Sequence, residues 1–146
     1  MNIKVVVVNS AQMLEQAMKI RTAVFVEEQG VEKELEFDGL DHLATSYLLL
    51  LDNVPVGTTR VRKTKEGCKI ERFAVLKNYR IQGLGKTLLH DVMNKTLPLG
   101  ERIYLNAQEQ VVEFYKKNGF QVCSDRFVEA NIPHFQMVSV ESLIRG

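Results

Sequence analysis

The strongest constraint on the fold is one crossover connection in a chain that otherwise consists of neighbouring hairpins. Residues 68–76 are typical of a strand, residues 85–97 repeat apolar side chains at helical spacing, and residues 102–106 form a second apolar run. A strand, a helix and a strand in this order pair the two strands in parallel. We therefore expect one parallel pair in the middle of a mostly antiparallel sheet.

The segments before the crossover predict a strand, a helix and a hairpin. Residues 4–8 are short and β-branched, and apolar residues then recur every three or four positions until Gly30. Residues 43–51 and 54–62 are typical of two strands, and Asp52-Asn53 between them favours a tight turn. With the strand of the crossover, they form an antiparallel meander.

After the crossover, residues 109–118 predict a helix that Gly119 closes, and residues 120–123 and 134–140 predict two final strands. The fold class is therefore α/β, an α+β sandwich. We expect a mixed, mostly antiparallel sheet of six to seven strands with about three to four flanking helices. The sequence has no repeat or linker, so residues 1–146 predict a single domain.

Composition and charge exclude several classes of function. With 19 basic and 18 acidic residues the net charge is +1, so we expect neither nucleic acid nor a membrane surface as a partner. There is no signal peptide and no run near the ~18 apolar residues of a membrane span, which predicts a cytoplasmic protein. Cys68 and Cys123 are expected as free thiols, with a disulfide or redox role as the alternative. The scattered His42, His90 and His134 predict no metal site.

A glycine-rich loop joins the first strand of the crossover to its helix. Backbone N–H groups at a helix start, with the positive end of the helix dipole behind them, can bind a pyrophosphate, and glycines allow its close approach. Basic side chains on either side add charge-assisted bonds. Alone, the loop is equally compatible with a simple glycine turn, and it lacks the dinucleotide and Walker patterns. The loop residues are Arg80, Ile81, Gln82, Gly83, Leu84, Gly85 and Lys86.

Other motifs at matching positions in the chain make the interpretation of this loop more specific. Arg80-x-x-Gly83-x-Gly85 resembles the coenzyme A pyrophosphate motif of the GNAT superfamily of N-acetyltransferases, and residues 114–120 resemble its second signature. The expected order of strands and helices is also similar to that family over essentially the whole chain. Four further segments resemble the ElaA/YjcF-like subgroup, namely residues 24–29, 70–75, 105–108 and 132–134.

This resemblance implies an enzyme that transfers the acetyl group of acetyl-CoA directly to a primary amine in a ternary complex. In the family, a bulged strand before the loop binds the pantetheine arm and the acyl carbonyl through backbone N–H groups, here of Phe73, Ala74 and Val75. Asn106 matches a residue that holds coenzyme A where the parallel strands separate. Tyr115 matches a general acid for the thiolate, although it is also compatible with a packed aromatic.

The general base is less defined by the sequence. Glu71 precedes the implied bulge on the same strand, Glu28 ends the first helix, and His134 starts the last strand. Each is equally compatible with a structural role, and an ordered water chain could deprotonate the amine instead.

The acceptor is open at this stage. Arg60 and Arg62 share one face of their strand, with Arg72 nearby; they either line the cleft and favour an acidic or phosphorylated acceptor, or form a solvated face. Residues 31–41 are acidic and aperiodic, and a loop there would cover a small-molecule site. The alternatives are a non-catalytic coenzyme A-binding protein and a protein lysine or N-terminal acetyltransferase. A homodimer is compatible with the resemblance.

Overall fold

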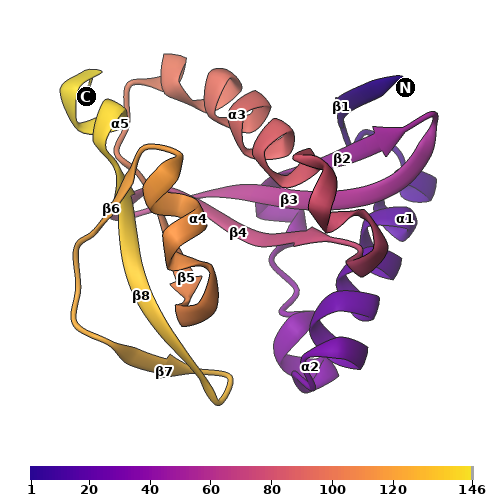
Figure 1. Ribbon diagram of the computed structural model, residues 1–146, viewed down its shortest axis with the longest axis horizontal. Helices are drawn as coiled ribbons and strands as arrows, with labels where there is room; N and C mark the ends of the chain where they lie inside the picture. The colour runs from indigo at the N-terminus through magenta and orange to yellow at the C-terminus, as the bar shows by residue number, and fades with distance from the viewer. Residues whose placement is uncertain (146) are drawn as a thin grey trace.

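The computed structural model describes residues 1–145, and at positions 81 and 145 it describes the backbone only. Its strands form one sheet in the order β1-β2-β3-β4-β5-β8-β6, with β7 paired to β8 outside this path (Figure 1). The strands are β1 (Ile3–Val7), β2 (Ala44–Leu51), β3 (Val54–Thr64), β4 (Gly67–Val75), β5 (Ile103–Gln108), β6 (Phe120–Val122), β7 (Phe127–Glu129) and β8 (Ile132–Ser139).

Helices cover both faces of the sheet. One buried apolar cluster lies against one face and includes Leu84, Leu88 and Tyr115. A second cluster lies against the other face and includes Ala17 and Ile20. The helices are α1 (Ala11–Arg21), continued by the π-helical turn η1 (Thr22–Glu28), α2 (Lys33–Glu36), α3 (Leu84–Thr96), α4 (Val112–Lys117) and α5 (Val140–Arg145). Short 3₁₀ turns are η2 (Asp41–Leu43), η3 (Lys77–Gln82), η4 (Leu97–Leu99) and η5 (Glu109–Val111).

Local chemistry explains the element boundaries that the sequence predicted. The Ser10 hydroxyl accepts a hydrogen bond from the Met13 N–H at 3.1 Å and caps α1. Asp52 and Asn53 both adopt positive φ, which gives the tight turn between β2 and β3 its required twist. Gly119 follows α4 with φ +91°, so the predicted closure of that helix is confirmed.

The crossover produces the predicted parallel pair and then a separation of its strands. β4 and β5 pair only from Cys68↔Ile103 to Ile70↔Leu105, while β5 stays paired to β8 up to Gln108. Beyond Ile70, the edge of β4 that faces β5 therefore has no strand partner in the described part of the chain. Figure 1 shows α1 and α2 on one side of this gap, and α4 with β7 and β8 on the other.

Three parts of the fold differ from the expectation. The sheet has eight strands rather than six to seven, because residues 127–129 form β7 and turn into β8 through Ala130 and Asn131, both at positive φ. Residues 31–41 were expected to be a loop and contain the short helix α2. A C-terminal helix, α5, follows β8 directly. The fold class itself, a mixed and mostly antiparallel sheet between helices, is confirmed.

The described residues contain neither a membrane-spanning helix nor a metal-binding cluster. In residues 1–145, no helix has the length and hydropathy that crossing a bilayer requires. The same residues contain no cluster of His, Cys, Asp or Glu side chains that could hold a metal ion. Cys68 is buried, Cys123 is exposed, and both are free thiols.

Candidate active site

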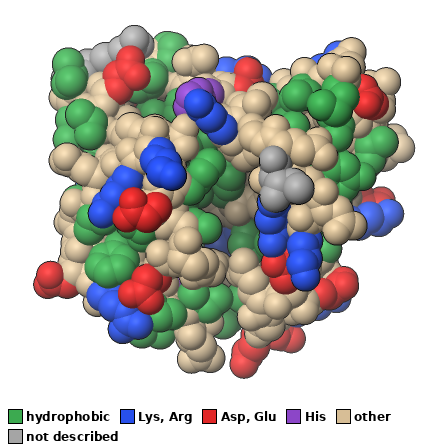
Figure 2. Space-filling model, viewed as in Figure 1, with side chains coloured by type: hydrophobic (Ala, Val, Ile, Leu, Met, Phe, Trp, Pro, Cys, Tyr) green, Lys and Arg blue, Asp and Glu red, His purple; other side chains and the backbone are tan. Residues whose placement is uncertain are grey.

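A cleft of about 830 Å³ opens where β4 and β5 separate. Its walls come from η1 and α2 on one side and from α4, the β7–β8 hairpin and β5 on the other. Figure 2 shows the molecule hollowed between these two sides, with hydrophobic side chains along part of the hollow. All three base candidates, together with Tyr115 and Asn106, line this cleft.

The phosphate loop ends in a helix start that is open to an anion. Gly83 has φ +71° and precedes α3, which has no capping side chain and no acidic residue in its first turn. The N–H groups of that turn therefore keep their hydrogen-bonding capacity, and the helix dipole places positive potential there. Leu84 buries its side chain in the core, so only its backbone can face a ligand, whereas Gln82 and Lys86 are exposed. The side chain of Ile81 lies outside the described residues.

Gly85 lies against the aromatic floor of the cleft. A Cβ atom at this position would lie 3.6 Å from the Phe114 ring and 3.9 Å from the Phe73 ring. A larger side chain would therefore project into the space between the loop and these rings. Glycine keeps the backbone accessible there.

The bulge implied for β4 is present. The pairing of β3 with β4 shifts register between Thr58 and Arg60, and Arg72 on β4 has φ +54°, a strained value for a non-glycine residue. Phe73, Ala74 and Val75 follow this bulge and line the cleft. Across the gap, Asn106 is the first residue of β5 beyond the parallel pairing, and it also lines the cleft.

Tyr115 is held by aromatic neighbours at the floor of the cleft. Its ring makes edge contacts with Phe114 and Phe120, at centroid distances of 5.1 and 5.8 Å, and with Phe73 at 6.0 Å. No described residue hydrogen-bonds its hydroxyl group, which is left free for a ligand. Burial raises the pKa of Tyr115 above its ordinary value, so the hydroxyl carries a proton at neutral pH.

Arg80 and Glu28 form an ion pair that the sequence did not predict. Both terminal nitrogens of Arg80 donate to the Glu28 carboxylate at 2.6 Å, and its Nε donates to the Val75 carbonyl at 2.8 Å. This pair links η1 to the phosphate loop and the end of β4. The hydrogen bond from Arg80 lowers the pKa of Glu28, which makes Glu28 a weaker base.

Glu71 is buried beneath three cationic side chains. Its carboxylate accepts from Arg62 at 2.7 Å and lies 3.1 Å from Arg60 and 3.2 Å from Lys69. Burial alone would raise the pKa of Glu71, but the hydrogen bond from Arg62 and the charges of Arg60 and Lys69 outweigh it and lower the pKa to about 2. Glu71 is therefore a permanent anion at neutral pH and a poor proton acceptor.

His134 is oriented as a proton acceptor. Its Nδ1 lies 2.6 Å from the Ile132 carbonyl, which can only accept, so in the neutral ring Nδ1 carries the hydrogen and Nε2 has the free lone pair. The imidazole is buried and stacks on Phe127 at a centroid distance of 5.7 Å. The Glu129 carboxylate lies 3.8 Å from Nε2, where it can stabilise a protonated ring.

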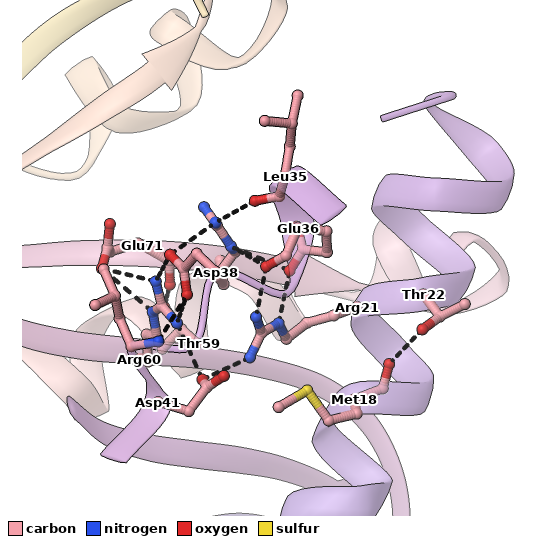
Figure 3. A network of polar contacts seen from close by, with 12 residues as sticks. Met18, Arg21, Thr22, Leu35, Glu36, Asp38, Asp41, Thr59, Arg60 and Glu71 are labelled. Carbon is pink, nitrogen blue, oxygen red and sulfur yellow. Dashed lines mark hydrogen bonds and ion pairs between the residues drawn. The ribbon is translucent and has the colours of Figure 1, made fainter. Parts of the chain in front are cut away.

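The two arginines of β3 differ, and only Arg60 follows neither of the two alternatives that the sequence left open. Arg60 is 1% exposed and forms ion pairs with Asp38, Asp41 and Glu71 (Figure 3). Neither a solvated face nor a cleft lining describes it. Arg62 and Arg72, by contrast, line the cleft.

Apart from Glu71, the acidic partners of these arginines come from residues 31–41. That segment contributes Glu36 and Asp38 to the cleft wall, and Asp41 lies behind them. Its acidic composition was the one signal of this network in the sequence. The basic partners Arg21 and Lys69 carried no such signal, because nothing in their spacing distinguishes them from surface charges.

Comparison with known proteins decides the family. A model described as an acetyltransferase (GNAT) domain matches residues 9–140. The chain belongs to the GNAT family. The N-acetyltransferase YjcF of Bacillus subtilis is 36% identical to this GNAT protein over 137 residues, which cover 92% of this chain and 98% of YjcF.

Solved structures agree with this family. The crystal structure of Escherichia coli ElaA superposes with a TM-score of 0.86 at 24% identity, over 94% of this chain and 99% of ElaA. An acyl-CoA N-acyltransferase from Pseudomonas aeruginosa also gives 0.86 at 24% identity, over 95% of this chain and 100% of that chain. These structures share the fold, and the identity to YjcF confirms the resemblance to the ElaA/YjcF-like subgroup. The acetyltransferase (GNAT) domain over residues 9–140 makes this protein an acyl-CoA-dependent N-acyltransferase.

Proposed function

We propose that this GNAT enzyme transfers the acetyl group of acetyl-CoA to the primary amine of a small molecule, directly and in a ternary complex. The observation that carries the proposal is a convergence in one cleft. The cleft is lined by Gly85 in the uncapped first turn of α3, by the bulged part of β4, and by Tyr115, whose hydroxyl has no partner among the described residues. In this assignment residues 80–86 hold the pyrophosphate, with Arg80 acting through its ion pair with Glu28 while Lys86 and the backbone N–H groups contact the ligand.

The same backbone and side chains supply the groups that acyl transfer requires. When bound, acetyl-CoA supplies an activated thioester. In the segment Phe73, Ala74 and Val75, the backbone N–H groups that point to the unpaired edge of β4 stabilise negative charge as it develops on the carbonyl oxygen. Asn106 holds the cofactor from the opposite strand.

Tyr115 acts as the general acid. As the C–N bond forms and the C–S bond breaks, its hydroxyl donates a proton to the departing sulfur. The pKa of Tyr115, raised by burial, keeps this proton in place until the thiolate develops. Its aromatic neighbours fix the direction of the hydroxyl and exclude water.

Among the three base candidates, the geometry favours His134. Glu28 is neutralised by Arg80 and Glu71 by three cations, whereas Nε2 of His134 has a free lone pair. In this assignment Nε2 accepts the proton that the amine loses, and Glu129 stabilises the resulting imidazolium. Glu28 and Glu71 then have structural roles.

The covered acceptor side supports a small molecule over a protein substrate. Residues 31–41, the α2 segment, contribute Leu35, Glu36 and Asp38 to the cleft wall, and ion pairs attach this segment to β3 and β4. A peptide backbone would need an open groove where this segment lies. We therefore propose a compact amine rather than a lysine on a folded partner.

The test is release of free thiol from acetyl-CoA in the presence of a panel of amino acids, amino sugars, polyamines and peptides. The proposal predicts turnover with a small amine. Calorimetric binding of acetyl-CoA without turnover of any amine would contradict catalysis and support the non-catalytic alternative. Turnover confined to peptides would contradict the small-molecule acceptor.

A further inference from the structure

Six charged side chains, in the wall of the cleft and behind it, form a closed ring with equal numbers of positive and negative charges. Arg21 pairs with Glu36 and Asp41, Arg60 with Asp41 and Asp38, and Arg72 with Asp38 and Glu36. The contacts lie between 2.7 and 3.2 Å. Each cation meets two carboxylates of the ring and each carboxylate meets two cations, so the ring leaves no charge over (Figure 3).

The charges next to this ring are not balanced. The single carboxylate of Glu71 forms ion pairs with both Arg62 and Lys69, at 2.7 and 3.2 Å. Arg60, a member of the ring, also forms an ion pair with Glu71 at 3.1 Å. With the ring neutral in itself, this group of Arg62, Lys69 and Glu71 carries one excess positive charge.

The excess charge lies in the cleft wall rather than in open solvent. The side chains of Arg62 and Lys69 are 22% and 17% exposed, and both line the cleft. Arg62 uses Nε and, at 3.4 Å, Nη2 on Glu71, and no described residue hydrogen-bonds its Nη1. A partly dehydrated cation with free donors is costly unless an anion completes it.

The other carboxylates that line the cleft do not supply that anion. Glu28 is bonded to Arg80, Glu36 and Asp38 belong to the ring, and Glu129 lies beside His134. The donors of Arg62 and Lys69 that Glu71 does not use are therefore open to a ligand in the cleft.

We propose that Arg62 and Lys69 bind an acidic group, a carboxylate or a phosphate, on the amine acceptor. This inference rests on the proposed function, since it assigns the acceptor end of the same cleft. Glu71, which both cations contact, lies two residues before Phe73 on β4, so the proposed acidic subsite is close to the strand segment that is proposed to hold the acyl carbonyl.

The test compares matched amines in the thiol-release assay. Amino acids are measured against their carboxamides, and amino-sugar phosphates against the free amino sugars. We expect the acidic member of at least one pair to have a kcat/KM about 10- to 100-fold higher, the range of a charge-assisted hydrogen bond. The two kinds of pair also distinguish a carboxylate from a phosphate.

Variants separate the subsite from the rest of the enzyme. Lys69→Met should raise KM for the acidic amine by about 10- to 100-fold, leave its carboxamide unaffected, and be rescued by Lys69→Arg. The matched control is Lys63→Met on β3, because Lys63 is 68% exposed and, among the described residues, pairs only with Glu101. Calorimetry of acetyl-CoA should give the same affinity for all of these proteins.

Two results would overturn the inference. One is equal or better turnover of the neutral amines in every pair, which leaves the proposed transferase function intact. The other is an unchanged KM for the acidic amine in Lys69→Met. If no amine is turned over, the proposed function fails, and calorimetric titration of the acidic amines into the coenzyme A complex decides the subsite. Weak binding that is equal in wild type and Lys69→Met then contradicts it.

Discussion

The two sides of the cleft are built from different materials. The proposed donor side consists of a helix start, a bulged strand edge and packed aromatic rings, and the contacts proposed for its ligand are mainly backbone N–H groups. The acceptor side consists of interlocking charged side chains from α1, the α2 segment, β3 and β4. A backbone-based site suits a ligand that is the same for a whole family. A side-chain-based site suits a ligand that differs from one member to the next.

The largest expected effect separates chemistry from binding on the donor side. Tyr115→Phe should lower kcat by about 10²–10⁴-fold, because only the proton donor is removed while the ring packing stays. Steady-state kinetics together with calorimetry of acetyl-CoA measure this. Wild-type kcat in the variant would show that Tyr115 is only a packed aromatic.

On the acceptor side, the expected effect is on stability. Arg21→Met should lower the free energy of unfolding by about 3–5 kcal/mol, because it leaves Glu36 and Asp41 buried with fewer partners. Urea denaturation measures this, with Lys19→Met on the same helix as control. Lys19 is 75% exposed and pairs with Glu15 at 3.8 Å, so its loss should cost less than about 0.5 kcal/mol. Equal destabilisation by the two variants would contradict a specific role for the ring.

The base assignment predicts a smaller kinetic effect. His134→Gln should lower kcat by about 10²-fold, at the lower end of general base catalysis, since water can partly replace the imidazole. Glu28→Gln is the comparison, and it should weaken acetyl-CoA binding through Arg80 more than it lowers kcat. A larger loss of kcat in Glu28→Gln than in His134→Gln would reverse the assignment.

The smallest effect concerns pH. Glu71 has a pKa lowered from 4.5 to about 2, so its contribution to stability is present above about pH 4.5 and is lost as the pH falls towards 2. Between about pH 5 and about pH 3, this group should account for on the order of 2 kcal/mol of lost unfolding free energy. Denaturation curves of wild type and Glu71→Gln measure it. If the unfolding free energies of the two proteins fell in parallel with pH, Glu71 would not be the source of this pH dependence.

The same contrast explains what the sequence could predict. The hairpin at Asp52-Asn53, the crossover and the loop at Gly83 depend on neighbouring residues, and their patterns were readable. The partners of Arg60 lie 11 to 22 residues away, at Glu71, Asp41 and Asp38, and ion pairs across such distances leave no periodic trace. The strand β7 was missed for a related reason. It has only three residues, and its turn at Ala130-Asn131 lacks glycine.

The division of the cleft into donor and acceptor sides is tested most directly by calorimetric titration of acetyl-CoA into wild type, Gly83→Asp, Gly83→Asn and Lys69→Met. A Cβ at Gly83 meets no atom within 4 Å, and both replacements share the cost of φ +71°, so their difference isolates charge. We predict at least about tenfold weaker binding for Gly83→Asp than for Gly83→Asn, a difference of about 1.4 kcal/mol, and wild-type binding for Lys69→Met. Equal affinities in the two Gly83 variants, or lost acetyl-CoA binding in Lys69→Met, would contradict the account.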